Sequence, residues 1–171
     1  MVDRNIQAAP RVGFALVSLA ERRGAGTALA VLVKENLGIA LPPPGHWVES
    51  GGLTAICTTP GQWLVQQDAD DFTLFERLGS LVQDTATVIE LSDSRLSVQI
   101  SGEGARTALG TFLPLDLHSR AMQPGHAAAT MAAHLPVLVR QIDATPTYQI
   151  MCARSFAESF YRALQLAGIP I

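Results

Sequence analysis

Two glycine pairs stand between an expected strand and an expected helix, where a phosphate group could bind. They lie at Gly24–Gly26 and Gly102–Gly104. The dinucleotide-binding fingerprint places a further glycine three residues later, but Leu29 and Thr107 occupy those positions, and a Walker lysine is missing. The carboxylate of Glu103 would also repel a phosphate. We therefore interpret both pairs as turn glycines.

The four histidines are candidates for metal binding, but their spacing does not favour it. His126 and His134 would share one face of a single strand, yet eight residues at the strand rise put them ~26 Å apart. Zinc ligands normally come in closer pairs. We interpret all four as surface or strand-edge residues: His46, His118, His126 and His134.

Residues for nucleophilic or acid–base catalysis are equally hard to assemble. The sequence contains no Gly-x-Ser-x-Gly motif. Asp70 and Asp71 fit the start of a helix, where carboxylates face its positive end. Glu90 and Asp93 flank the end of an expected strand. The sequence thus assigns no catalytic, cofactor-binding or metal-ligating residue.

Hydrophobic periodicity predicts short helices interleaved with strands. Helices are expected over 27–37, over 103–110 and after Ser155, and Gly38 is expected to cap the first of them. A further helix is expected to start at residue 70, with Phe72, Phe75, Leu78 and Val82 on one face. In the last helix Ser155 and Glu158 fit a capping box, and Gly168 with Pro170 ends it. Strands are expected from Val12 to Leu19 and over 53–58, 62–66, 87–91, 96–100, 127–133, 137–142 and 148–152.

Frequent hairpins and short helices favour the α+β class over a doubly wound parallel sheet. We expect a mixed, largely antiparallel sheet with short helices packed on it. In the strand over 96–100, Leu96, Val98 and Ile100 should share one face, and Arg95, Ser97 and Gln99 the other. Residues 1–10 are expected to form a flexible leader, and residues 11–171 a single domain.

Composition limits the classes of partner. Twelve basic and fifteen acidic residues give a net charge of −3, and Lys34 is the sole lysine. Because nucleic-acid binding needs a basic stripe, we expect no nucleic-acid partner. Hydrophobic residues make up 48% of the chain and charged residues 16%. This balance fits either an apolar surface that a partner covers or a core rich in alanine and valine.

We expect a cytoplasmic protein with no membrane partner. The N-terminus lacks the basic and apolar regions of a signal peptide. The run over 121–139 has no formal charge, but its proline, glycine and histidine residues argue against a membrane span. Cys57 and Cys152 fall in expected strands, and we interpret them as buried, reduced core residues.

Six short motifs, in order and spacing, resemble the gamma subunit of heterotetrameric sarcosine oxidase, within the wider folate-dependent aminomethyltransferase-like superfamily. The resemblance covers about residues 11–168. It implies the folate-binding N-terminal fold of the aminomethyltransferases. The motifs are Pro60–Val65, Leu91–Arg95, Ser101–Ala105, Leu115–His118, Pro124–Gly125 and Ala153–Ala157.

The chain departs from the active members of that superfamily. Active aminomethyltransferases are much longer and carry their catalytic aspartate in a Gly-Gly-x-x-Asp-Asp-like segment, which is missing here. Iron–sulfur-maintenance relatives carry a Lys-Gly-Cys-Tyr-like motif, and neither Cys57 nor Cys152 lies in one. The resemblance therefore implies a half-length, catalytically silent subunit that binds no cofactor. FAD, FMN, NAD, zinc and tetrahydrofolate would belong to the larger flavoprotein alpha and beta subunits.

Two alternatives remain open. One is a stand-alone folate-binding or aminomethyltransferase-like protein. The other is the small subunit of a related N-methyl amino acid dehydrogenase. Because arginine and tryptophan are enriched in interfaces, five residues are candidate partner contacts, with ordinary core or surface roles as the alternative. These are Trp47, Trp63, Arg95, Arg120 and Arg154.

Overall fold

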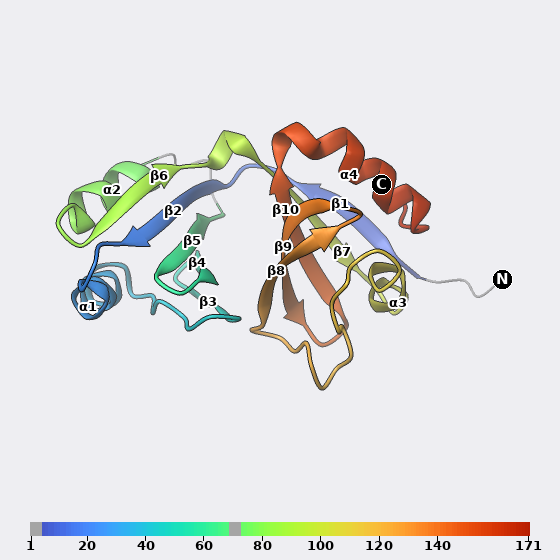
Figure 1. The fold of residues 1–171 in the computed structure, drawn as a ribbon, viewed down its shortest axis with the longest axis horizontal. Helices are drawn as coiled ribbons and strands as arrows, with labels where there is room; N and C mark the ends of the chain where they lie inside the picture. The colour runs from blue at the N-terminus through green and yellow to red at the C-terminus, as the bar shows by residue number, and fades with distance from the viewer. Residues whose placement is uncertain (1–4, 69–72) are drawn as a thin grey trace. The chain divides into compact units, whose positions relative to one another are not determined.

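The computed structural model of the chain contains two compact units, each built on one five-stranded antiparallel sheet (Figure 1). It describes residues 5–68 and 73–171. The inserted unit comprises Gly13–Ser92. The terminal unit combines the described residues up to Val12 with Asp93–Ile171. The single domain predicted for residues 11–171 thus spans both units.

The sheet of the inserted unit has the strand order β3-β4-β5-β2-β6. Hairpin connections join β3 to β4 and β4 to β5, and every described pair is antiparallel. Its elements are β2 (Ala15–Glu21), α1 (Gly26–Leu37), β3 (Trp47–Ser50), β4 (Leu53–Thr59), β5 (Gln62–Gln67), α2 (Leu74–Val82) and β6 (Ala86–Glu90).

Both helices of the inserted unit bury a narrow apolar face. In α1, Leu29 and Val33 are fully buried, and the predicted cap is confirmed because Gly38 adopts φ 68°. In α2 the buried residues are Leu74, Leu78 and Val82, which recur every four residues. Phe75 was predicted on this face but is 38% exposed, because Leu74 takes the core position. The predictions for Asp70, Asp71 and Phe72 lie outside the described residues.

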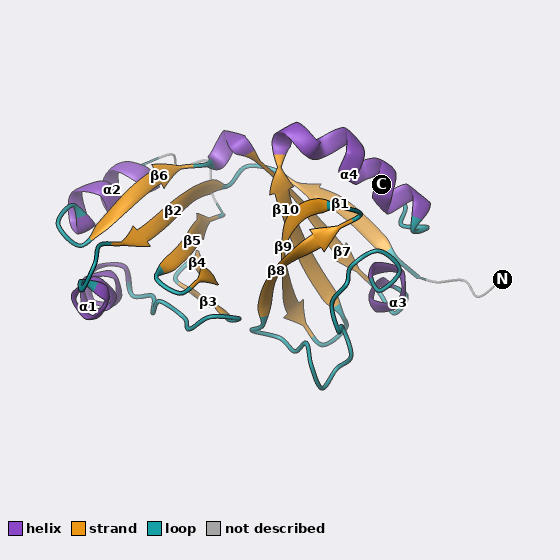
Figure 2. Ribbon diagram, in the orientation of Figure 1, coloured by secondary structure: helices purple, strands orange, loops and turns teal. Residues whose placement is uncertain are grey.

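The sheet of the terminal unit has the strand order β1-β7-β10-β9-β8, again antiparallel throughout the described pairs (Figure 2). Helices α3 and α4 pack on it through one apolar cluster. Its elements are β1 (Gln7–Arg11), β7 (Arg95–Ser101), α3 (Ala105–Leu109), β8 (Ala127–Ala132), β9 (Leu135–Asp143), β10 (Thr147–Ala153) and α4 (Ala157–Leu166), with short 3₁₀ turns at Ser92–Ser94 and Arg154–Phe156.

The α+β class, the antiparallel pairing and the alternation along β7 are confirmed. Leu96, Val98 and Ile100 all belong to the helix-facing core cluster. On the opposite face, Ser97 is fully buried and accepts a hydrogen bond from the Gln149 side chain. The structure distributes the strands over two sheets where the sequence predicted one.

Two boundaries of the terminal unit differ from expectation. The flexible leader predicted over 1–10 is wrong for Gln7–Pro10, which pair with β7 as edge strand β1. Pro10 is compatible with an edge strand. Such a strand has a neighbour on one side only, so a residue without an N–H need not remove a hydrogen bond from the ladder. The predicted capping box is also wrong: Ser155 lies in a 3₁₀ turn, so α4 starts at Ala157 and its N-cap, Phe156, makes no side-chain cap bond.

A two-residue turn joins β8 to β9, and both of its residues are left-handed. Ala133 has φ 46° and His134 has φ 71°. This conformation costs an L-residue about 1–2 kcal/mol, and such turns favour Asn-Gly. We expect Ala133→Asn combined with His134→Gly to raise the free energy of unfolding by about 1 kcal/mol. Urea denaturation would show this as a higher midpoint with an unchanged slope, whereas a lower midpoint would contradict the strain.

Candidate functional site

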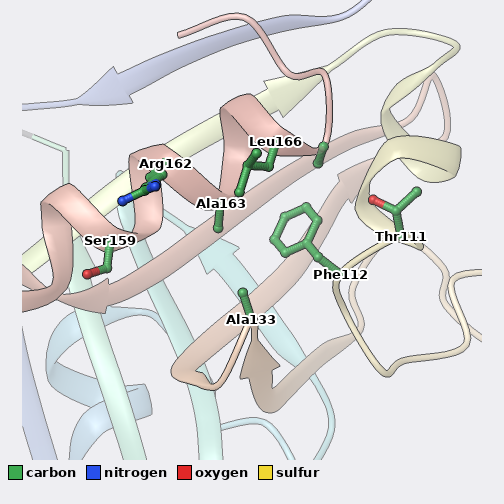
Figure 3. A pocket seen from close by; sticks show the side chains of 8 residues that line it. Thr111, Phe112, Ala133, Ser159, Arg162, Ala163 and Leu166 are labelled. Atoms are coloured by element: carbon green, nitrogen blue, oxygen red, sulfur yellow. The ribbon is translucent and has the colours of Figure 1, made fainter.

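An apolar groove lies on the terminal unit between α4, the segment after α3 and the β8–β9 turn (Figure 3). We call it the α4 groove; its volume is about 440 Å³. The Phe112 ring lies between the labelled helix residues and Thr111 in this view. Its lining residues include Thr111, Phe112, Ala133, Ser159, Arg162 and Leu166.

The polar groups at the α4 groove differ in how far the chain already satisfies them. The Thr111 hydroxyl donates to the Ala108 carbonyl at 2.7 Å. The Arg162 guanidinium makes no hydrogen bond or ion pair with the described part of the chain, and its side chain is exposed. An apolar floor beside one available cation can bind an apolar group that carries a carboxylate.

A second groove, of about 390 Å³, continues from the first. The two share Thr111, Phe112 and Ala133 as lining residues. Met131 and His134 extend the lining along β8 and its turn. Because the two grooves adjoin, we treat them as one surface, which we call the α4–β8 surface.

A buried polar row crosses three neighbouring strands of the terminal sheet. The Gln149 amide on β10 donates to Ser97 Oγ on β7 at 2.7 Å, and its oxygen accepts from Arg140 Nε on β9 at 2.5 Å. All three side chains are at most 3% exposed. This row was not predicted from the sequence, although an arginine inside the apolar run of β9 is a signal for it. These contacts within the sheet indicate a structural role.

The structure places the five predicted partner contacts in different surroundings. Trp63 is 9% exposed and its indole N–H donates to the Pro42 carbonyl at 2.9 Å, so it is a core residue of the inserted unit. Trp47 is half-buried at the start of β3. The remaining three belong to the terminal unit: Arg95, Arg120 and Arg154.

Arg95 and Arg154 are brought together, whereas Arg120 lies elsewhere in the terminal unit. Arg154 Nε donates to the Asp93 carbonyl at 2.6 Å, and its Nη2 donates to the Arg95 carbonyl at 3.3 Å. Arg154 thereby ties the start of α4 to the start of β7. Arg120 is exposed, and its backbone N–H donates to His118 Nδ1 at 3.2 Å.

The turn glycines leave little room for a phosphate. Beside Gly26, the Glu21 carboxylate already lies over the start of α1, where a Cβ on the glycine would be 2.6 Å from its oxygen. At Gly102 a Cβ would come closer still, to the Asn5 backbone carbonyl oxygen. Both contacts support the interpretation that these glycines serve tight turns. No group of three metal-ligating side chains occurs within residues 5–68 and 73–171.

Cys57 and Cys152 are buried thiols in strands, as the sequence predicted. Burial raises the pKa of Cys57. Burial also raises the pKa of Cys152 to about 11, against a smaller opposing effect of the Arg95 charge. Because the reactive species is the thiolate, both side chains are suited to packing and unsuited to nucleophilic chemistry at neutral pH.

We expect neither cysteine of the folded chain to react with a thiol reagent such as DTNB over hours at pH 8. Both should react within minutes after unfolding in guanidinium, which serves as the control. Rapid modification of the folded chain would contradict this burial.

The raised pKa of Cys152 also makes the free energy of unfolding depend on pH. Because the thiol of the unfolded chain has its usual, lower pKa, unfolding releases a proton above that pKa, and the free energy of unfolding should fall between about pH 9 and about 11.

Known proteins resemble the chain in sequence. It matches the sarcosine oxidase, gamma subunit family over residues 22–169. It is 28% identical over 123 residues to sarcosine oxidase subunit gamma of Corynebacterium sp. (strain U-96), covering 71% of this chain and 60% of the relative. It is 29% identical over 141 residues to the Arthrobacter sp. subunit, covering 81% of this chain and 66% of the relative. The matches thus span less than two thirds of these relatives' lengths.

Solved structures share the fold. The heterotetrameric sarcosine oxidase of Corynebacterium sp. U-96, in complex with pyrrole 2-carboxylate, superposes with a TM-score of 0.84 at 24% identity, covering 98% of this chain and 85% of that chain. Aminomethyltransferase T of the glycine cleavage system from Bartonella henselae gives 0.66 at 12% identity, covering 93% and 45%. Within the described part of the chain, no helix is long and apolar enough to cross a bilayer. The chain belongs to the sarcosine oxidase gamma subunit family.

Proposed function

We propose that this chain is a small non-catalytic subunit of a heterotetrameric sarcosine oxidase complex. The complex would oxidatively demethylate sarcosine to glycine and transfer the one-carbon unit to tetrahydrofolate. The observation that carries this proposal is the family match over residues 22–169. The larger flavoprotein alpha and beta subunits are the proposed partners, and FAD, FMN, NAD, zinc and tetrahydrofolate belong to them.

The chemistry of the described side chains supports a binding role over a catalytic one. The row of Ser97, Gln149 and Arg140 is used inside the sheet, and burial keeps both cysteines protonated. The α4 groove offers apolar surface and one cation. Two buried free thiols also fit the reducing cytoplasm, where we place the complex.

We keep three predicted contacts in the proposed interface because their side chains are exposed or half-buried: Trp47, Arg95 and Arg120. Arg154 is exposed but already donates to two backbone carbonyls, so any partner contact would share its guanidinium. We leave out Trp63, whose side chain packs in the core of the inserted unit.

Co-expression tests the proposal. A tagged form of this chain, produced with the large dinucleotide-binding flavoprotein and the smaller flavin oxidase subunits, is expected to purify as a stoichiometric flavin-containing complex that converts sarcosine to glycine. Failure to co-purify with either flavoprotein would overturn the proposal. Turnover of N-methylglutamate in place of sarcosine would instead identify the related dehydrogenase.

Calorimetry addresses the stand-alone alternative. The chain alone, titrated with tetrahydrofolate, is expected to give no binding heat, because the proposal assigns folate to a larger subunit. Saturable binding to the isolated chain would favour the stand-alone folate-binding protein.

A further inference from the structure

We propose that the α4–β8 surface of the terminal unit binds an acidic, apolar segment of a larger partner subunit. This inference rests on the proposed function and adds the place and the chemistry of the contact. Three independent features of the described residues carry it: exposed apolar side chains, the sign of the charge, and a strained turn.

Apolar side chains line this surface and remain exposed to solvent. Leu166, in the last turn of α4, is 83% exposed, and Met131 on β8 is 42% exposed. Phe112 is half-buried between them along the two grooves. Large apolar side chains that share one hollowed surface mark protein–protein contacts more often than isolated exposed ones do.

The charge of the surface is positive. Arg162 and His134 are the ionisable side chains among its described lining residues, and no carboxylate lines either groove. Glu158 precedes Arg162 by one helical turn but forms no ion pair with it in the described structure. Arg162 can therefore receive a carboxylate of the partner, and arginine is among the residues that contribute most to binding energy.

The β8–β9 turn has alanine and histidine at two positions where asparagine and glycine would be less strained. Ala133 and His134 both adopt positive φ, and both line the surface. The Ala133 N–H donates to the Phe112 carbonyl at 3.3 Å, which fixes the turn against the Phe112 segment. Strain of this kind persists where the surroundings or the function require it.

The spread of the lining over α4, the Phe112 segment and β8 indicates a chain segment as the occupant. Two grooves of about 440 and 390 Å³ share three lining residues and together run from α4 to β8. An extended or helical segment fills two adjoining grooves with successive apolar side chains. The occupant we infer presents at least two of these side chains and places a carboxylate against Arg162.

The test compares variants of the chain in the complete complex by the concentration at which half of the complex dissociates. Leu166→Glu and Arg162→Glu are each expected to raise this concentration at least tenfold. Gln165→Glu is the matched control, because it adds a negative charge at an exposed position of the same helix that does not line either groove. Thermal melting of each isolated variant verifies its fold.

A further variant separates assembly from stability. Ala133→Asn combined with His134→Gly should stabilise the isolated chain and yet raise the dissociation concentration several-fold, an opposite pair of effects that a purely structural turn would not produce. Unchanged assembly of the Leu166 and Arg162 variants, or an equal loss with Gln165→Glu, would overturn the inference while the proposed function stands. Failure of the unmodified chain to assemble would overturn both.

Discussion

Gly102→Ala is expected to lower the free energy of unfolding by about 3 kcal/mol, through backbone strain and a steric clash combined. Gly102 has φ 109°, in a region that residues with a Cβ avoid. A Cβ built there would also clash with the Asn5 carbonyl oxygen. The obstacle is backbone, so no side-chain rotation can relieve the contact.

The damage from Gly102→Ala should be greatest at β1. Gly102 follows Ser101, which pairs with Gln7 in the β1–β7 ladder. Moving Asn5 away from a new methyl group pulls on the start of that ladder. Urea denaturation would measure the loss of stability, and hydrogen exchange should show the β1 amides losing protection before those of β9 and β10.

Gly125→Ala provides the matched control for the clash. Gly125 has φ 90°, but nothing lies within 4 Å of the position of its Cβ. Only the strain remains there, which costs about 1–2 kcal/mol. If the two variants lost the same stability, the Asn5 contact would contribute nothing and the argument for Gly102 would fail.

Gly102 also illustrates what sequence could predict about this fold. Local chemistry was sufficient to identify it as a turn glycine between a strand and a helix, because alternation and glycine placement are local signals. Its close contact with Asn5 required the pairing of Gln7–Arg11 with β7, two segments far apart in the sequence. A short strand that contains Pro10 gives only a weak local signal, so these residues were expected to form a leader.

The α4–β8 surface was beyond sequence analysis for the same reason. Its lining comes from the segment after α3, the β8–β9 turn and α4, which only the tertiary fold brings together. The left-handed turn could not be predicted because Ala133 and His134 are not typical of such turns. Arg154 was predicted only as a candidate partner contact, because its two backbone acceptors depend on where β7 starts relative to the last helix.

Phe160→Ala should have the largest effect on stability, a loss of about 3–5 kcal/mol in the free energy of unfolding. Phe160 is fully buried on α4 and belongs to the core cluster with Tyr148, Ile150 and Leu164. Removing its ring takes away apolar contacts and leaves a cavity that the rigid sheet cannot fill. Because α4 also forms one wall of the α4 groove, weaker assembly of the complex should accompany the loss.

Phe156→Ala is the control that distinguishes burial from the general loss of an aromatic ring. Phe156 lies one helical turn earlier and is 37% exposed, so its replacement should cost less than about 1.5 kcal/mol. Urea denaturation of both variants, with far-ultraviolet circular dichroism as the readout, measures the difference. Equal losses would mean that α4 is not held to the sheet through Phe160. A large loss confined to Phe160→Ala would show that this ring holds the helix, and with it the proposed docking surface, in place.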